Sequence, residues 1–187
     1  SMGRLLRLPV NDSVLPKMGR LAQGPMTMRL LPGEELVGSL SIDVAEADPT
    51  LLLVSRKGQM TRIDLTPLRR CQRGDLGMMA VALSTDEDSV AGLCSGNSLA
   101  GIVTDQKRHG RLNASGVDLP AVGQSWSDQL DLNSKEQVVS VVALKTSGSR
   151  RRCNPRWLHH QFAGQQRLIH GDRVLPIKTG AAEMAGL

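Results

Sequence analysis

The stretch LLLVSRKGQMTRIDL, which runs from Leu51 to Leu65, indicates the fold class of this chain. Its first apolar run ends at Ser55, the charged turn Arg56-Lys57-Gly58 follows, and a second run begins at Gln59. Two short runs rich in Leu, Val and Ile that are joined by a Gly-containing turn are typical of a β-hairpin. The stretch therefore predicts two antiparallel strands with cationic side chains at their connecting tip.

The pattern of this hairpin, and of the segments that follow it, occurs more than once in the chain. Three segments of a first unit align in order with three segments of a second unit, at offsets of 53 to 55 residues: 3–10 with 58–65, 19–30 with 72–83, and 32–38 with 86–92. Weaker third and fourth copies of the hairpin are expected at Gly110 and at Gly148. Repeats of about 40 to 55 residues are typical of propeller blades and related arrays.

Each full unit contains four short runs that have the character of strands. In the second unit we expect these strands at Leu51–Ser55, Gln59–Leu65, Met78–Leu83 and Val90–Ser95. No segment has sustained helical periodicity, so the sequence predicts an all-β, propeller-like fold in which neighbouring units stack. We expect one domain over residues 1–187, with about four blades at 3–48, 49–96, 97–143 and 144–180.

The first unit has no strand before Gly3, where the second unit has one before Gly58. A strand-like run near the end of the chain, Val174–Lys178, is a candidate for the missing partner. We therefore hypothesise that Val174–Lys178 pairs with Arg4–Leu8 and closes the ring.

The composition indicates an acidic partner. The chain has 187 residues and a formal net charge of +5, which favours nucleic acid first. It has no Tyr, two Trp and one Phe, so the aromatic platforms that stack single-stranded bases are lacking and duplex phosphate is the better target. Its three Cys form no C-x-x-C pair, and we expect no metal and no cofactor. No apolar run approaches the roughly 20 residues of a membrane span, and we expect a cytoplasmic protein.

Cationic side chains recur at the hairpin tips and in the loops after them. Arginine and lysine in such loops can reach phosphate oxygens, and the backbone N–H groups of a Gly-containing loop can approach phosphate closely. The alternative for any one residue is a solvated tip that keeps an exposed strand edge from pairing with other chains. The predicted DNA-binding belt consists of Lys17, Arg20, Arg56, Lys57, Arg69, Arg70, Arg73, Lys107, Arg108, Arg111, Arg150, Arg151 and Arg152.

The segment KMGRLAQGPMTMRLLPGEELVGSLSI, residues 17–42, resembles the repeat of the C-terminal domain of the DNA gyrase A protein. Residues 51–68 are similar to the hairpin of that family, and the resemblance is strong over residues 3–105. It implies a β-pinwheel, a propeller-like ring whose outer rim binds duplex DNA and bends it. No side chain stands out as a base reader, so we expect binding without sequence specificity. The related protein of topoisomerase IV has a similar domain, and the sequence leaves the choice between the two open.

One departure from the family concerns the box that gyrase uses for full wrapping of DNA. The nearest stretch here is CQRGDLG, residues 71–77, which keeps Gln72, Arg73, Gly74 and Gly77 but has Asp75-Leu76 in its middle. This is a degenerate copy of the box. It puts wrapping in doubt but leaves plain DNA binding as the expectation.

The resemblance implies an accessory domain of an ATP-dependent type IIA topoisomerase that is not catalytic by itself. Strand cleavage in that family needs a tyrosine, which this chain lacks, and no P-loop signature is present. The implied partners are duplex DNA, the breakage-reunion part of the topoisomerase and its ATPase component, in the bacterial cytoplasm at the nucleoid. The alternative that remains is a propeller-like scaffold that binds a protein partner through an acidic patch on that partner, and an enzyme acting alone is a third possibility.

Overall fold

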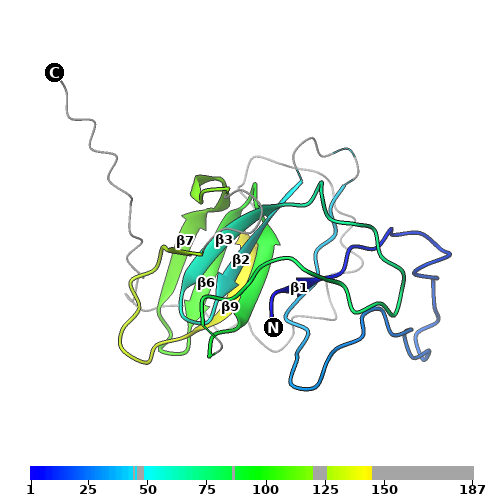
Figure 1. Cartoon of the computed structure of the whole chain (residues 1–187), viewed down its shortest axis with the longest axis horizontal. Helices are drawn as coiled ribbons and strands as arrows, with labels where there is room; N and C mark the ends of the chain where they lie inside the picture. Colours follow the sequence, from blue (N-terminus) through cyan, green and yellow to red (C-terminus); the bar gives the residue numbers. More distant parts are fainter. Residues whose placement is uncertain (44, 46–48, 86, 120–125, 145–187) are drawn as a thin grey trace.

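The computed structural model describes residues 1–43, 45, 49–85, 87–119 and 126–144. In these residues the chain forms β-strands and one short 3₁₀ turn, which confirms the predicted all-β class (Figure 1). The elements are β1 Arg4–Leu5, β2 Thr50–Ser55, β3 Gln59–Asp64, β4 Met78–Met79, β5 Val90–Ser95, β6 Leu99–Thr104, β7 His109–Asn113, η1 Ala114–Gly116, β8 Ser127–Asp128 and β9 Val138–Leu144.

The predicted hairpin at residues 51–65 is confirmed. Strands β2 and β3 pair antiparallel, from Thr50 opposite Asp64 to Val54 opposite Met60. The turn closes with a hydrogen bond from the N–H of Gly58 to the carbonyl of Ser55 at 3.1 Å, and Gly58 adopts a φ of +84°. Glycine takes this left-handed conformation without steric cost, which explains why the turn contains it.

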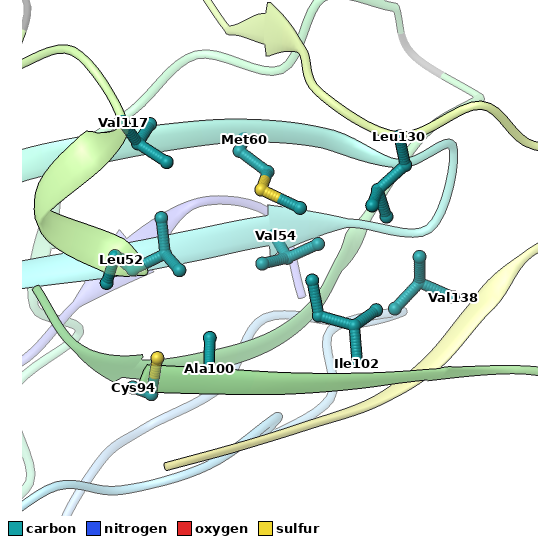
Figure 2. Close-up of a cluster of buried hydrophobic side chains, with 10 residues drawn as sticks. Leu52, Val54, Met60, Cys94, Ala100, Ile102, Val117, Leu130 and Val138 are labelled. Atoms are coloured by element: carbon teal, nitrogen blue, oxygen red, sulfur yellow. The ribbon is translucent and has the colours of Figure 1, made fainter. Parts of the chain in front are cut away.

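Strand β2 explains the unbroken apolar run in the sequence, because both of its faces are buried. Leu52 and Val54 point into a cluster with Met60 and Ile102, which Figure 2 shows in close-up. Leu51 and Leu53 point the opposite way, into a second cluster. A strand covered on both faces carries apolar residues at successive positions instead of alternating them with polar ones.

The third unit repeats the second, but in a different register from the one predicted. Lys107 has a φ of +62° and occupies the place of Gly58, so the expected start of the copy at Gly110 is wrong by three residues. Two further features fix the true register. The Oγ of Ser55 accepts from the N–H of Gln59 at 3.1 Å, and the Oγ1 of Thr104 accepts from the N–H of Arg108 at 3.2 Å. Gly110-Arg111-Leu112 has the same sequence as Gly3-Arg4-Leu5, and this match favours the wrong alignment of the third copy.

The second and third units each contribute a short strand that pairs with the unit before them. The four-stranded sheet has the order β5-β2-β3-β8, and its last strand comes from the following unit. Strand β4 pairs in the same way with β1 of the preceding unit, with Arg4 opposite Met79 as Gln59 is opposite Asp128. The third sheet has the order β7-β6-β9. The sheets thus mix residues from successive units, and the blade limits 3–48, 49–96, 97–143 and 144–180 stay predictions.

The first unit forms less regular structure than the second. Between residues 6 and 49, within the described part of the chain, the pairing is limited to an isolated bridge between Arg7 and Arg70. Val37 and Ile42, which correspond to positions around β5, pack against the cluster of Leu51 and Leu53 without forming a ladder. Among the described residues, no strand pairs with this segment. The predicted closing strand, Val174–Lys178, lies outside the described residues.

Replacing Gly77 by alanine is expected to reduce the free energy of unfolding by about 2–3 kcal/mol. Gly77 has a φ of +76°, and a Cβ there would lie 2.5 Å from the carbonyl oxygen of Leu5, so the β1–β4 contact must shift. Gly74→Ala is the matched control, because Gly74 has a φ of +86° with nothing within 4 Å of its Cβ position. Urea unfolding should show the larger loss for Gly77→Ala, whereas equal losses would rule out the close approach as the cause.

Candidate nucleic-acid interface

A buried carboxylate recurs in the three described units. Glu34, Asp88 and Glu136 occupy equivalent positions two residues before Leu36, Val90 and Val138. Glu34 accepts from the N–H of Leu31 at 2.8 Å, and Glu136 accepts from the N–H of Asn133 at 2.9 Å. Each of these two carboxylates therefore closes a turn, one just before Leu36 and the other just before Val138.

Two of these carboxylates are paired with an arginine. Arg4 donates from Nε to Glu34 at 2.8 Å and from a second nitrogen to the other oxygen. These bonds hold the pKa of the Glu34 carboxyl below its usual range. Arg108 donates from one nitrogen to one oxygen of Glu136, and Thr104 donates to the other oxygen at 2.6 Å. Burial alone would raise the pKa of Glu136, but the donors around it outweigh burial and lower it.

Arg108 is thus engaged inside the fold. Its side chain is 15% exposed, and besides Glu136 it donates to the carbonyl of Asp131 at 3.2 Å. A guanidinium held by a buried carboxylate is not available to a phosphate. We therefore leave Arg108 out of the set of DNA contacts proposed below, although the sequence pattern placed it there.

A second set of equivalent arginines donates hydrogen bonds from one unit to the next. Arg7 donates to the carbonyls of Leu65 at 2.8 Å and Leu68 at 3.0 Å in the second unit. Arg62, the equivalent residue, donates to the carbonyl of Ser115 at 3.1 Å in the third unit. Arg111 is the equivalent residue of the third unit, and it is exposed. The segment of the fourth unit that would correspond to Arg111 lies outside the described residues, as do Arg150, Arg151 and Arg152.

The second unit has glutamine where the first and third have the paired arginine. Gln59 replaces Arg4 and Arg108, and the carboxylate of Asp88 is 3% exposed with its Oδ2 lacking a hydrogen-bond partner among the described residues. The Oδ1 atom accepts from the N–H groups of Lys57 and Ser89. A buried carboxylate oxygen without a donor is costly, so this unit carries a local defect.

Replacing Gln59 by arginine is therefore expected to stabilise the protein by about 1–2 kcal/mol, because it restores the donor that the neighbouring units have. Gln59→Ala serves as the control, since it removes the exposed bonds to Asp128 and Ser84 without adding a cation. Midpoints of urea unfolding report the difference. If Gln59→Arg is no more stable than the parent, the carboxylate of Asp88 does not lack a cation.

The hairpin tips do not form a continuous row of cations. Arg56 lies 3.9 Å from Glu35, and Nζ of Lys57 lies 3.6 Å from Glu87. Both cations are exposed. The tip of β6–β7 has Asp105 and Gln106 in their place, followed by the exposed Lys107. Charge at the tip is thus partly neutralised in the second unit, and the third unit has Lys107 as a cation at its tip but none at the positions of Arg56 and Lys57.

The loops after the hairpins do repeat a cationic turn. In the first unit the N–H of Ala22 donates to the carbonyl of Gly19 at 3.1 Å, and in the second the N–H of Asp75 donates to that of Gln72 at 3.2 Å. The two turns are 53 residues apart. Each has an exposed arginine at its second position, Arg20 in one and Arg73 in the other. The second turn, with Gly74, lies inside the degenerate box of residues 71–77, and Gly77 is the last residue of that box.

The fold brings these two loops into contact. The N–H of Cys71 donates to the carbonyl of Arg7 at 2.8 Å, and the N–H of Gly74 donates to that of Thr27 at 2.8 Å. Arg73 also reaches the carbonyl of Val14 at 3.4 Å. The loop of the second unit therefore runs between two segments of the first, and in Figure 1 the green stretch beyond β3 extends among the blue residues.

The loops that are in contact carry exposed cations from both units. We name the set the basic loop patch; it consists of Lys17, Arg20, Arg29, Arg69, Arg70 and Arg73. Sequence reasoning missed Arg29, whose N–H donates to the carbonyl of Asp75 at 3.0 Å. Its aligned residue in the second unit is Ala82, so the repeat carried no signal for it. Asp75 is the acidic residue in the loop, and its carboxylate accepts from the N–H of Gln72 at 2.8 Å.

Among the described residues, no group of three His, Cys, Asp or Glu side chains is arranged to hold a metal ion. The described part of the chain likewise contains no helix that is long and apolar enough to cross a membrane.

Solved structures with a similar fold include C-terminal domains of type IIA topoisomerases. The C-terminal domain of DNA topoisomerase IV aligns with a TM-score of 0.53 and 17% identity, over 72% of this chain and 38% of that one. The chain has the β-pinwheel fold. The DNA gyrase A C-terminal domain aligns with a TM-score of 0.54 and 21% identity, over 65% of this chain and 42% of that one.

The E. coli ParC C-terminal domain aligns with a TM-score of 0.52 and 17% identity, over 77% of this chain and 59% of that domain. This β-pinwheel chain thus covers between 38% and 59% of the lengths of these three structures. No protein-family model matches the chain, and no curated protein matches it in sequence. The predicted resemblance to the gyrase and topoisomerase IV domains is confirmed at the level of the fold.

Proposed function

We propose that this chain is a non-catalytic accessory domain of a type IIA topoisomerase that binds and bends duplex DNA without sequence specificity. The observation that carries the proposal is the repeated cationic turn of Arg20 and Arg73, in two loops that contact each other. Arg20 and Arg73 recur at equivalent positions of successive units, so the two side chains could contact successive stretches of one bent duplex. The likeness to topoisomerase domains supports the same function.

The basic loop patch is large enough to make the binding favourable. Bending a duplex by 40–90° over 20–30 base pairs costs on the order of 1–6 kcal/mol. Six to ten phosphate contacts offset this cost at low salt, and they make the affinity fall by about 10³–10⁵ between 50 and 200 mM salt. Specificity for sequence is expected to be low, because contacts to phosphate carry no direct base information.

We propose bending without handed wrapping. In the degenerate box the carboxylate of Asp75 accepts the N–H of Gln72, so that N–H is not free to donate to a phosphate. The same carboxylate adds a negative charge to the loop and repels phosphate. Both effects weaken the grip of this loop on DNA relative to a box with arginine and glycine in its middle.

The partners we propose are the breakage-reunion part of the topoisomerase, its ATPase component and duplex DNA, at the nucleoid of a bacterial cytoplasm. Strand cleavage and ATP hydrolysis would take place on those other parts of the enzyme. The role of this domain would be to hold and curve a DNA segment for them.

The test combines binding to a small relaxed plasmid with a nicking-closing enzyme, followed by electrophoresis of the closed circles. We expect salt-sensitive binding with little change in linking number. A clear change in linking number would contradict the bending-only proposal and indicate a handed wrap. Absence of binding even at low salt would overturn the DNA-binding function and favour a scaffold for a protein partner.

A further inference from the structure

Leu21 is the most exposed large apolar side chain among the described residues, with 97% of its surface accessible. It lies in the turn that the bond from Ala22 to Gly19 closes, directly after Arg20. Gly19 and Gly24, on either side, have nothing within 4 Å of their Cβ positions. Residues 19–24 are all exposed, so the turn presents an aliphatic side chain beside a cation at the surface.

The equivalent turn of the second unit lacks this side chain. Gly74 occupies the position of Leu21, next to Arg73, which is equivalent to Arg20. The two turns thus share the cation that suits phosphate and differ in the residue beside it. The second turn offers contacts to the DNA backbone alone, whereas the first adds an apolar group that can reach past the phosphates.

We infer that Leu21 inserts between two base pairs of the bound duplex, through the minor groove, and kinks it at that step. The inference rests on the proposed DNA-binding function and assigns the bend to one residue. Apolar wedges of this kind, commonly Leu, Ile, Met, Phe or Pro, unstack a base step and open a kink of about 20–90° toward the major groove. Arg20 and Lys17 would hold the flanking phosphates while the side chain is inserted.

Charge favours a base step over a protein surface as the occupant. Residues 11–31 contain Lys17, Arg20 and Arg29 as cations and Asp12 as the one acidic residue. Leu21 therefore projects from a locally positive loop toward whatever polyanion the loop binds. A protein partner that covers Leu21 would be revealed by the test below as an absence of any change in DNA stacking.

The experiment uses duplexes with 2-aminopurine at successive positions, whose fluorescence rises when the base is unstacked, and with a dye pair at the ends to report the bend. Binding of the parent should raise the fluorescence at flexible pyrimidine–purine steps and shorten the end-to-end distance. Leu21→Ala should lose both signals while its affinity stays within about tenfold, because the phosphate contacts remain. Leu21→Phe should retain the signals.

Leu36→Ala is the matched control, since Leu36 is an exposed leucine of the same unit outside this turn, and it should behave as the parent. The high exposure of Leu21 means that its variants should unfold at the midpoint of the parent. Salt-sensitive binding with no fluorescence change, or equal signals from Leu21→Ala and the parent, would overturn the wedge and leave the DNA-binding function intact. No binding of the parent at low salt would overturn both.

Discussion

Replacing Glu136 by glutamine is expected to reduce the free energy of unfolding by about 3–5 kcal/mol. The Glu136 side chain is fully buried, and it accepts hydrogen bonds from Thr104, the N–H of Asn133 and Arg108. The neutral amide leaves the charge of Arg108 without its counter-ion and places an NH₂ group where the carboxylate accepted donors. The third unit should therefore lose the turn that leads into β9.

Urea unfolding measures this loss, and Glu35→Gln provides the matched control. Glu35 forms an exposed pair with Arg56 at 3.9 Å, and such pairs contribute at most about 1 kcal/mol. Similar losses for the two variants would contradict the structural role given to the buried pair.

The pH dependence of the same loss has a definite sign. Because the pKa of Glu136 is lowered in the folded state, its contribution is complete above the unfolded pKa of about 4.3 and is lost as pH falls through the lower folded value. The difference in stability between the parent and Glu136→Gln should therefore shrink below about pH 4. A difference that stays constant down to strongly acidic pH would show that the carboxylate charge is not what stabilises the fold.

Replacing Arg69, Arg70 and Arg73 together by alanine is expected to lower the affinity for duplex DNA by about 10- to 100-fold at moderate salt. These exposed side chains supply half of the basic loop patch, and each phosphate contact that is lost reduces the slope of log affinity against log salt by about 0.9. Fluorescence anisotropy with duplexes of several sequences should show the same loss for each, because the contacts are to phosphate.

The double variant of Arg56 and Lys57 is the control for this result. These cations lie beside Glu35 and Glu87, so removing them together should change the slope less than removing the three loop arginines does. A larger effect from the tip than from the loop would move the DNA-binding surface to the β2–β3 hairpin.

The local elements of this fold could be predicted from the sequence because their signals are local. The run of four apolar residues from Leu51 and the turn at Gly58 specify a hairpin without any knowledge of the rest of the chain. The register of the third copy is not visible in the sequence, because Lys107 adopts a positive φ where the other units have Gly3 and Gly58. A lysine in that conformation is uncommon, and no composition signal marks it.

The pairing of distant side chains could not be predicted in the same way. Arg108 looked like the other cations of the hairpin tips, yet its partner lies 28 residues further on. The sequence does contain a signal, because Arg4 and Glu34 form the same kind of pair 30 residues apart. The correspondence appears only when Lys107 is aligned with Gly3. The exchange of β4 and β8 between units depends on how the units stack, which two-residue strands do not reveal in sequence.

The contact between the two cationic loops also needed the structure. The sequence showed that Arg20 and Arg73 are equivalent, but equivalent residues of a ring can lie far apart. The bonds from Gly74 to Thr27 and from Arg29 to Asp75 bring their loops together. The sequence therefore predicts cationic loops, and the structure shows that the two loops contact each other.

The central claim is that the basic loop patch binds duplex phosphate, and the salt dependence of duplex binding tests it most directly. Affinity for a linear duplex of about 40 base pairs should be measured by anisotropy between about 50 and 200 mM salt. If the six cations of the patch each neutralise one phosphate, the slope of log affinity against log salt will be about −5. A slope near zero, or no binding even at the lowest salt concentration, would contradict the account.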